Sequence, residues 1–168
     1  MHPNQHSQKK FSKELCKKFS ISMFEKILNP ILISFENEPE NIKKLFISNN
    51  QRRQQLINFM MKNFADLEFN PYQIATSAFY CHKFLSCLVK KCHKFSYMFL
   101  KSIIILSITA AHKITCDYVC PTKVLQKHFN INNLGALEKE YYEMIGYKLF
   151  APENNIMSFY NVLMVIEN

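Results

Sequence analysis

Cysteine and histidine side chains, the usual ligands of zinc in proteins, gather in one stretch of the sequence. This stretch contains Cys81, His82, Cys87, Cys92 and His93. The spacing Cys-x5-Cys-x4-Cys-His lacks the close Cys-x2-Cys pair that is common in structural zinc sites. Cys81 also falls on a helix face expected to be buried, where a free thiol behaves as a small hydrophobe. We therefore expect unpaired thiols here and no metal ion.

The chain has six cysteines in 168 residues, and a domain of this size buries a core without needing disulfide cross-links. No secretory signal precedes the cysteines, which favours a reducing compartment, the nucleus or the cytoplasm or both. The apolar run from Ser102 to Ala111 is shorter than the ~20 residues that cross a bilayer, so no membrane segment is expected.

Sequence motifs of common enzymes are missing. The chain contains no Gly-rich nucleotide loop, no His-Glu-x-x-His pair and no Gly-x-Ser-x-Gly elbow. We therefore expect a non-catalytic binding or regulatory protein that needs no cofactor.

The charge of the sequence favours acidic partners. Lys and Arg number 21 against 13 Asp and Glu, a formal charge of +8 at pH 7. Such a charge attracts nucleic acid or an acidic protein face. Because the lysines are spread along the chain, a generally solvated basic surface is the simpler interpretation, and nucleic acid is the less favoured partner.

Composition and periodicity predict an all-α fold. Two glycines in the whole chain leave little room for tight hairpins. From Phe24 to Phe35 apolar residues recur at helical spacing, with Pro30 as an expected kink. A basic flexible arm is expected over residues 1–18, and an N-terminal helix with a connector over 19–49. Further helices are expected at 50–64, 71–88, after Ser96, at 121–129, at 134–145 and after Pro152.

Helix-terminal residues support these boundaries. Asn70 before Pro71 is a capping side chain followed by proline at the first helical position. Ser96 can cap the next helix, which is apolar around almost its whole circumference and is therefore expected at the centre of the bundle. Gly146 can close the helix at 134–145 in a left-handed conformation.

Several short motifs follow one another in a fixed order between Arg53 and Tyr160. They are Arg53 with Leu56, Asn58, Phe59 and Met60; then Tyr80-Cys81-His82-Lys83-Phe84-Leu85-Ser86; then Ala111-His112-Lys113, Leu137-Glu138 and Tyr147-Lys148-Leu149. In this order and spacing they resemble the cyclin box. The stretch from Asn133 to Glu138 is most similar to the phosphate-regulon, or P/U-type, cyclins, which have a single box.

The resemblance implies a five-helix cyclin box over residues 50–150, preceded by an extra N-terminal helix and followed by a C-terminal helix over 151–168. It implies a cell-cycle regulatory subunit that binds and activates a cyclin-dependent protein kinase. In the family, the lysine and glutamate matching Lys113 and Glu138 meet the kinase helix that moves inward on activation. The kinase-binding residues implied in this way are Ala110, Lys113, Ile114, Glu138, Tyr142, Tyr147 and Leu149.

The sequence departs from the family at two places. His82 stands where the family has Asp, so Arg53 needs another acceptor. Arg52 and Phe59 replace the methionine and tryptophan of the family's substrate-docking patch, and an arginine there repels basic substrate motifs.

Two alternatives stay open at this point. Lys113 and Glu138, taken singly, also fit ordinary charges near helix ends. The alternative function is a cyclin-fold binding or structural subunit of a larger protein or nucleic-acid assembly that activates no kinase.

Overall fold

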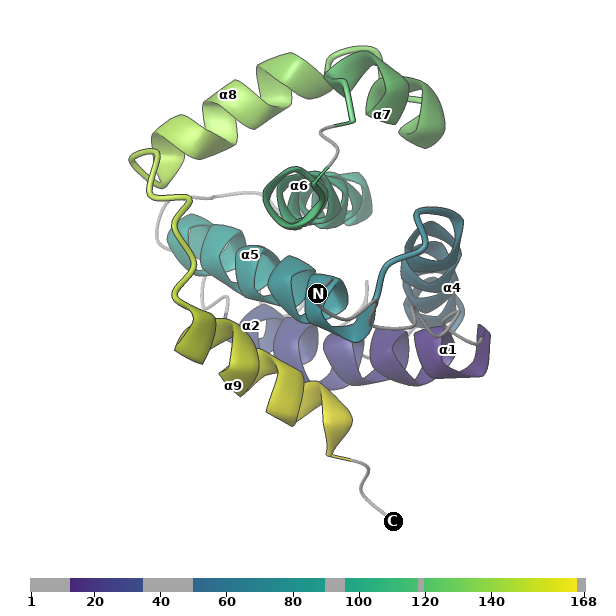
Figure 1. Cartoon of the computed structure of the whole chain (residues 1–168). Coiled ribbons are helices and arrows are strands. Elements are labelled where there is room, and N and C mark those ends of the chain that lie inside the picture. Colours follow the sequence, from purple (N-terminus) through teal and green to yellow (C-terminus); the bar gives the residue numbers. More distant parts are fainter. Residues whose placement is uncertain (1–12, 35–49, 90–95, 118–119, 166–168) are drawn as a thin grey trace, which may run out of the picture.

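The chain folds into helices, with no strand, over the residues that the structure describes, 13–34, 50–89, 96–117 and 120–165. In this computed structural model the prediction of an all-α fold is confirmed (Figure 1). The elements are α1 (Lys13–Ser22), the π-helical turn η1 (Met23–Leu28), α2 (Asn29–Ile33), α4 (Asn50–Asp66), α5 (Pro71–Val89), α6 (Tyr97–Thr115), α7 (Thr122–Phe129), α8 (Leu134–Met144) and α9 (Glu153–Met164).

The N-terminal helix is continuous from α1 through η1 to α2, and its irregular turn has a local cause. Proline has no N–H to donate, and its ring collides with the carbonyl four residues before it. The turn before Pro30 is wide: the Asn29 N–H donates to the Phe24 carbonyl, five residues back. The distortion expected at Pro30 thus takes the form of a π turn.

The flexible arm predicted over residues 1–18 is too long at its C-terminal end. The first helix already begins at Lys13, because Cys16 is fully buried in the core and needs an ordered backbone. Residues 1–12 and the predicted connector over 35–49 lie outside the described residues.

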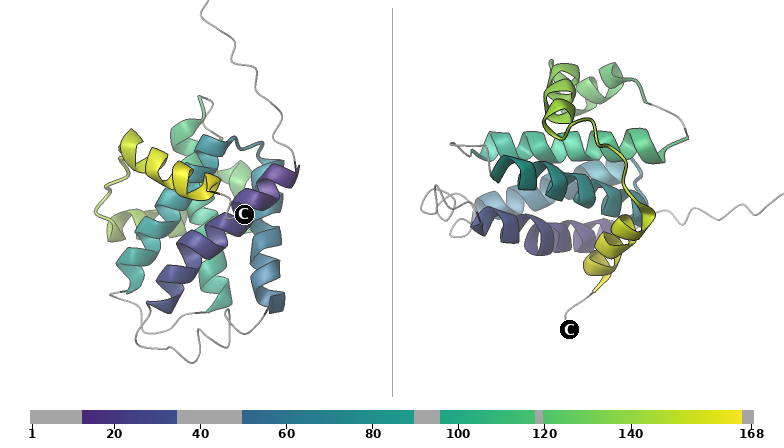
Figure 2. Two further views of the ribbon diagram at one scale, coloured as in Figure 1. Left: turned by 90° about the horizontal axis from the view of Figure 1, so that it is seen from below. Right: turned by 90° about the vertical axis from the view of Figure 1, so that its left-hand side faces the viewer.

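Helix α6 occupies the centre of the molecule, as its sequence predicted. The view along its axis in Figure 1 shows α7 and α8 on one side, α5 on the other and α4 alongside. Figure 2 shows the same order as layers, with α1, α2 and α9 beyond α5. Ten residues of α6 are buried, from Leu100 to Ala111. A helix that is apolar all round gains most when every face is covered, so it takes this position.

Helix α6 is also the one helix in the described ranges that is long and apolar enough, at 19 residues, to cross a membrane. The apolar run of 102–111 considered in the sequence is only its middle part. In the structure this middle part packs against other helices of the chain.

Most of the predicted helix ends are observed. Asn70 and Gln73 form a reciprocal capping box, in which each backbone N–H donates to the other side chain, at 2.8 and 2.9 Å. The Ser96 hydroxyl accepts from the Phe99 N–H at 3.1 Å. Gly146 has a φ of +62° and closes α8. The side chain of Asn133, directly before α8, makes no capping hydrogen bond.

Helix α9 returns across the bundle and packs against α5 and the N-terminal helix. The Lys26 ammonium donates to the carbonyls of Val162, at 3.4 Å, and Val165, where α9 ends. A cation at a helix C-terminus is favoured by the helix dipole and satisfies carbonyls that lack intrahelical partners. The two ends of the described chain are joined in this way.

Candidate functional site

The two charges singled out in the sequence meet in one hydrogen-bonded group. The Lys113 ammonium lies 2.7 and 2.9 Å from the two carboxylate oxygens of Glu138, and 2.8 Å from the Thr122 hydroxyl oxygen. The Thr122 hydroxyl lies 3.4 Å from Glu138 Oε2, and the Tyr142 hydroxyl donates to Oε1 at 3.0 Å. We call these four residues the Lys113–Glu138 cluster.

Three helices position the cluster. Lys113 lies in the last turn of α6, where the helix dipole favours a cation. Thr122 is the first residue of α7, directly after Pro121. Glu138 and Tyr142 are one turn apart on α8, at the i,i+4 spacing that places two side chains on the same helix face. The cluster therefore joins the central helix to the two helices that cover it.

The cluster is largely removed from solvent. The side chain of Glu138 is 7% exposed and that of Lys113 is 25% exposed. An ammonium group has three N–H donors, and all three have acceptors in this cluster. Burial and the neighbouring Glu138 carboxylate raise the pKa of Tyr142, so its hydroxyl remains a donor. A buried carboxylate is tolerated only with such partners.

The other residues implied by the resemblance are placed in different environments. Ile114 and Tyr147 are exposed, and Tyr142 and Leu149 are partly buried. Ala110 is 1% exposed and lies in the core. It shares the helix stripe of Lys113 but is one turn deeper, where α6 is covered on all sides, so the structure does not offer Ala110 to a partner.

A short segment after α8, residues 145–152, which we call the strap, is held against α5. The Tyr80 hydroxyl donates to the Leu149 carbonyl, and the Lys83 ammonium donates to the Lys148 carbonyl. Tyr147 has a φ of +54°, a left-handed conformation that is uncommon for a residue with a side chain. Burial raises the pKa of Tyr80 to about 12.

Two residues, Thr122 and Phe150, were not singled out by the sequence. It did not assign Thr122 a role, although its position directly after the helix-starting Pro121 places its hydroxyl at a helix N-terminus. It also missed Phe150, which is 81% exposed. The sequence contains no signal for this exposure, because a phenylalanine beside Leu149 reads as a core residue.

Arg53 finds the alternative acceptor that the sequence required. Its guanidinium forms an ion pair with Glu25 of η1 and lies 5.6 Å from the centre of the Phe24 ring. His82 instead packs edge-on against Phe159 of α9, with ring centres 5.5 Å apart. Burial lowers the pKa of His82, which favours the neutral imidazole. The N-terminal helix thus supplies the carboxylate that is missing at His82.

The surface around Phe59, which the resemblance alone would compare with a substrate-docking patch, carries positive charge. The Lys101 ammonium lies 4.7 Å from the centre of the Phe59 ring, and Arg52 is two turns earlier on the helix of Phe59. Positive charge at this surface disfavours basic peptide segments.

The zinc ligands considered in the sequence do not come together in the described part of the chain. In the ranges that the structure describes, no group of three or more His, Cys, Asp or Glu side chains is placed to hold a metal ion. Cys81 is fully buried, and burial raises the pKa of its thiol to about 12. The cysteines within those ranges are unpaired, while Cys92 and His93 lie outside them.

No family model, no curated protein and no solved structure matches this chain. Functional assignment therefore depends on the motifs of the sequence and the geometry described above.

Proposed function

We propose that this chain is a single-box, cyclin-like regulatory subunit that binds and activates a protein kinase of the cyclin-dependent class. The observation that carries the proposal is the ion pair between Lys113 and Glu138, at 2.7 Å. The resemblance selected these residues from two separate motifs, 25 positions apart in the sequence, and the fold brings them into contact. Two unrelated charges at helix ends would have no reason to lie in contact with each other.

The helix arrangement also supports the proposal. A cyclin box needs a central third helix with the first, second, fourth and fifth packed around it. Helix α6 takes the central place, and α4, α5, α7 and α8 surround it in that order along the chain (Figure 1). The N-terminal helix and α9 lie outside these five (Figure 1 and Figure 2).

The surface around the cluster suits a docking helix. Ile114 follows Lys113 in the sequence and Tyr147 lies in the strap after α8, and both are exposed apolar side chains. Apolar contacts around a satisfied polar centre are typical of specific interfaces. In the proposed mechanism the chain binds the active conformation of the kinase more tightly than the inactive one. Shifting a kinase from 1:99 to 99:1 requires a difference of about 5.5 kcal/mol between the two affinities.

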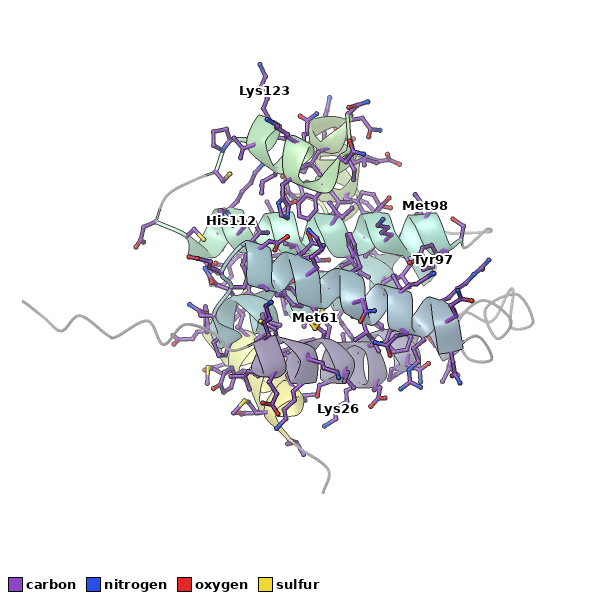
Figure 3. All side chains as sticks on the ribbon, turned by 90° about the vertical axis from the view of Figure 1, so that its right-hand side faces the viewer. Lys26, Met61, Tyr97, Met98, His112 and Lys123 are labelled. Atoms are coloured by element: carbon purple, nitrogen blue, oxygen red, sulfur yellow. The ribbon has the colours of Figure 1, made fainter. Side chains whose placement is uncertain are left out.

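The test is purification of the tagged full chain from its own cells, followed by identification of the proteins that co-purify. The variants Ile114→Asp and Tyr147→Ala change exposed side chains on the proposed face and leave the buried cluster in place. The matched control is Met98→Asp, which also changes an exposed apolar residue of α6. Figure 3 shows Met98 and His112, the neighbour of Lys113, near opposite ends of this helix.

We expect one kinase in stoichiometric amount with the wild type and the Met98→Asp control, and at least about tenfold less with the two face variants, as for hot-spot residues. The purified kinase should then gain activity when the wild-type chain is added back. If other proteins or nucleic acid are recovered and no kinase is, the chain is a subunit of a different assembly. Nucleic-acid binding would show itself by a steep loss of affinity with added salt.

A further inference from the structure

Phe150, in the strap, has the highest exposure, 81%, of the large apolar side chains in the described ranges. A lone exposed apolar residue is ordinary on a protein surface. Here, however, it is accompanied by a second exposed aromatic residue, Tyr147, three positions earlier on the same strap. Removing a large apolar side chain from water is favourable, so a partner that covers Phe150 gains binding free energy.

The backbone that carries Phe150 is held in place at two successive peptide groups, Lys148–Leu149 and Leu149–Phe150. The carbonyl of Lys148 accepts from Lys83, and that of Leu149 accepts from Tyr80. Tyr80 is itself fully buried in α5, so the strap is tied to the core of the molecule. A partner that binds Phe150 therefore has little backbone entropy to remove, and pre-organisation of this kind strengthens binding.

The side chains of the strap differ in their exposure to solvent. After the turn at Tyr147 the exposure of successive side chains alternates from residue 148 to residue 151. Leu149 and Ala151 pack on the core, whereas Lys148 and Phe150 are exposed. The cation and the aromatic ring are thus both exposed to solvent.

Lys83 binds the backbone of Lys148, so this place carries two lysines. Burial lowers the pKa of Lys83, the neighbouring Cys87 raises it, and the neighbouring charge of Lys148 lowers it. Neither lysine takes part in an ion pair within the described residues. The two acidic residues nearest to Lys148 in the sequence are Glu143 and Glu153. Glu143 accepts a hydrogen bond from the Tyr147 hydroxyl at 3.2 Å, and Glu153 is the first residue of α9.

We propose that the strap is a docking surface for an acidic segment of a partner protein, with Phe150 as its apolar anchor and Lys83 and Lys148 as the cations that attract carboxylates. Aromatic anchors contribute most of the affinity at interfaces, and complementary charge contributes selectivity and association rate. Charge argues against a second copy of this chain as the occupant, because each copy carries a formal charge of +8. The strap also contains Tyr147 and Leu149, which the proposed function places on the kinase-binding face. The proposal is therefore tested at Phe150 and Lys148, which that face does not use, so its failure can be told apart from failure of the proposed function.

The test starts with selection of binders to the purified full chain from a random peptide library displayed on phage. Selected peptides are synthesised, and their affinities for the wild type and three variants are measured by calorimetry. The variants are Phe150→Ala, Lys148→Glu and the control Met98→Ala, which removes another apolar side chain of 65% exposure. None of the three side chains is buried, so all variants should fold.

We expect the selected peptides to be rich in Asp and Glu and to contain a large apolar residue. Phe150→Ala should weaken them by about tenfold or more. Lys148→Glu should weaken them by about threefold to tenfold and reduce the dependence of affinity on salt. The Met98→Ala control should bind as the wild type does.

Three results would overturn the proposal. One is that selection yields no binder, or only peptides without acidic enrichment. Another is that Phe150→Ala and Met98→Ala have equal effects on affinity. The third is that sedimentation of the chain alone shows a dimer that Phe150→Ala abolishes, because the occupant of the strap would then be a second copy.

Discussion

The Lys113–Glu138 cluster includes two residues of α8, and the strap follows directly after this helix, yet the charged groups of the two regions are in opposite environments. In the cluster, a buried carboxylate and a partly buried ammonium satisfy each other with help from two hydroxyl groups. At the strap, Lys83 binds the carbonyl of a second lysine, Lys148, and the aromatic ring of Phe150 is left in water. The charged groups of the cluster are paired with each other inside the fold, whereas the lysines at the strap have no carboxylate partner within the described residues.

Because of this difference, substitutions in the cluster should affect stability, and substitutions on the exposed side of the strap should affect binding. A change in the cluster leaves a buried charge without a partner, and its cost appears in the free energy of unfolding. A change at the exposed side of the strap removes nothing that the fold needs, and its cost appears only when a partner is present.

The largest effect is expected from Lys113→Ala. The substitution leaves the Glu138 carboxylate buried with two hydroxyl partners and no cation, which should reduce the free energy of unfolding by about 3–5 kcal/mol. Urea unfolding followed by circular dichroism measures the change. The double variant Lys113→Ala/Glu138→Ala should lose less stability than the two single changes added together. A loss of less than about 1 kcal/mol for Lys113→Ala would contradict the description of the cluster as buried and mutually dependent.

A smaller loss is expected from Tyr142→Phe, which removes one hydrogen bond to Glu138 and keeps the ring. Hydrogen bonds to charged groups contribute about 1.5–3 kcal/mol, so the free energy of unfolding should fall by about that amount. The matched control is Tyr147→Phe, because that hydroxyl also donates to a carboxylate, but at an exposed position. Equal losses for the two variants would show that burial of the cluster contributes nothing.

Tyr80→Phe tests the attachment of the strap to α5, since it releases the Leu149 carbonyl and keeps the buried ring. We expect a loss of about 1 kcal/mol at neutral pH. The pKa of Tyr80 is about 12 in the folded protein against 10.0 for the free side chain. Because the folded state keeps this proton longer, its contribution is complete below pH 10 and is lost as the pH rises toward 12. Stability measured from pH 8 to 11 should therefore fall more steeply for the wild type than for Tyr80→Phe, and parallel curves would contradict the assignment.

The ion pair of Arg53 with Glu25 should matter less than the cluster, because both side chains are well exposed. Arg53→Ala should reduce the free energy of unfolding by about 0–1 kcal/mol from the ion pair, with a further small part from contact with Phe24. The loss should shrink at high salt. A loss as large as that of Lys113→Ala would mean that this pair, and not the cluster, is the main electrostatic brace of the fold.

The smallest effect is expected from Phe150→Ala, whose free energy of unfolding should stay within about 0.5 kcal/mol of the wild type. Thermal unfolding of the two proteins side by side checks this. A clear loss of stability would show that Phe150 packs on the fold in solution, and the comparison between the two regions would then fail.

The sequence by itself determined the helices and most of their ends. Periodicity and capping are local properties, so the capping box at Asn70, the cap at Ser96 and the left-handed Gly146 could be predicted from a few neighbouring residues. The all-apolar circumference of α6 also determined its central position, since only a covered helix keeps every such face from water. The motifs additionally selected Lys113 and Glu138 before their contact was known.

The tertiary structure decided what these helices do to one another. The burial of Ala110, the choice of Glu25 as the partner of Arg53 and the entry of Thr122 into the cluster all depend on how distant helices cross. Helical periodicity tells which side of a helix is covered, but not how far along its axis the cover extends. The exposure of Phe150 has the same origin: its direction is set by two side chains of α5 that hold the strap from 65 and 69 positions away in the sequence.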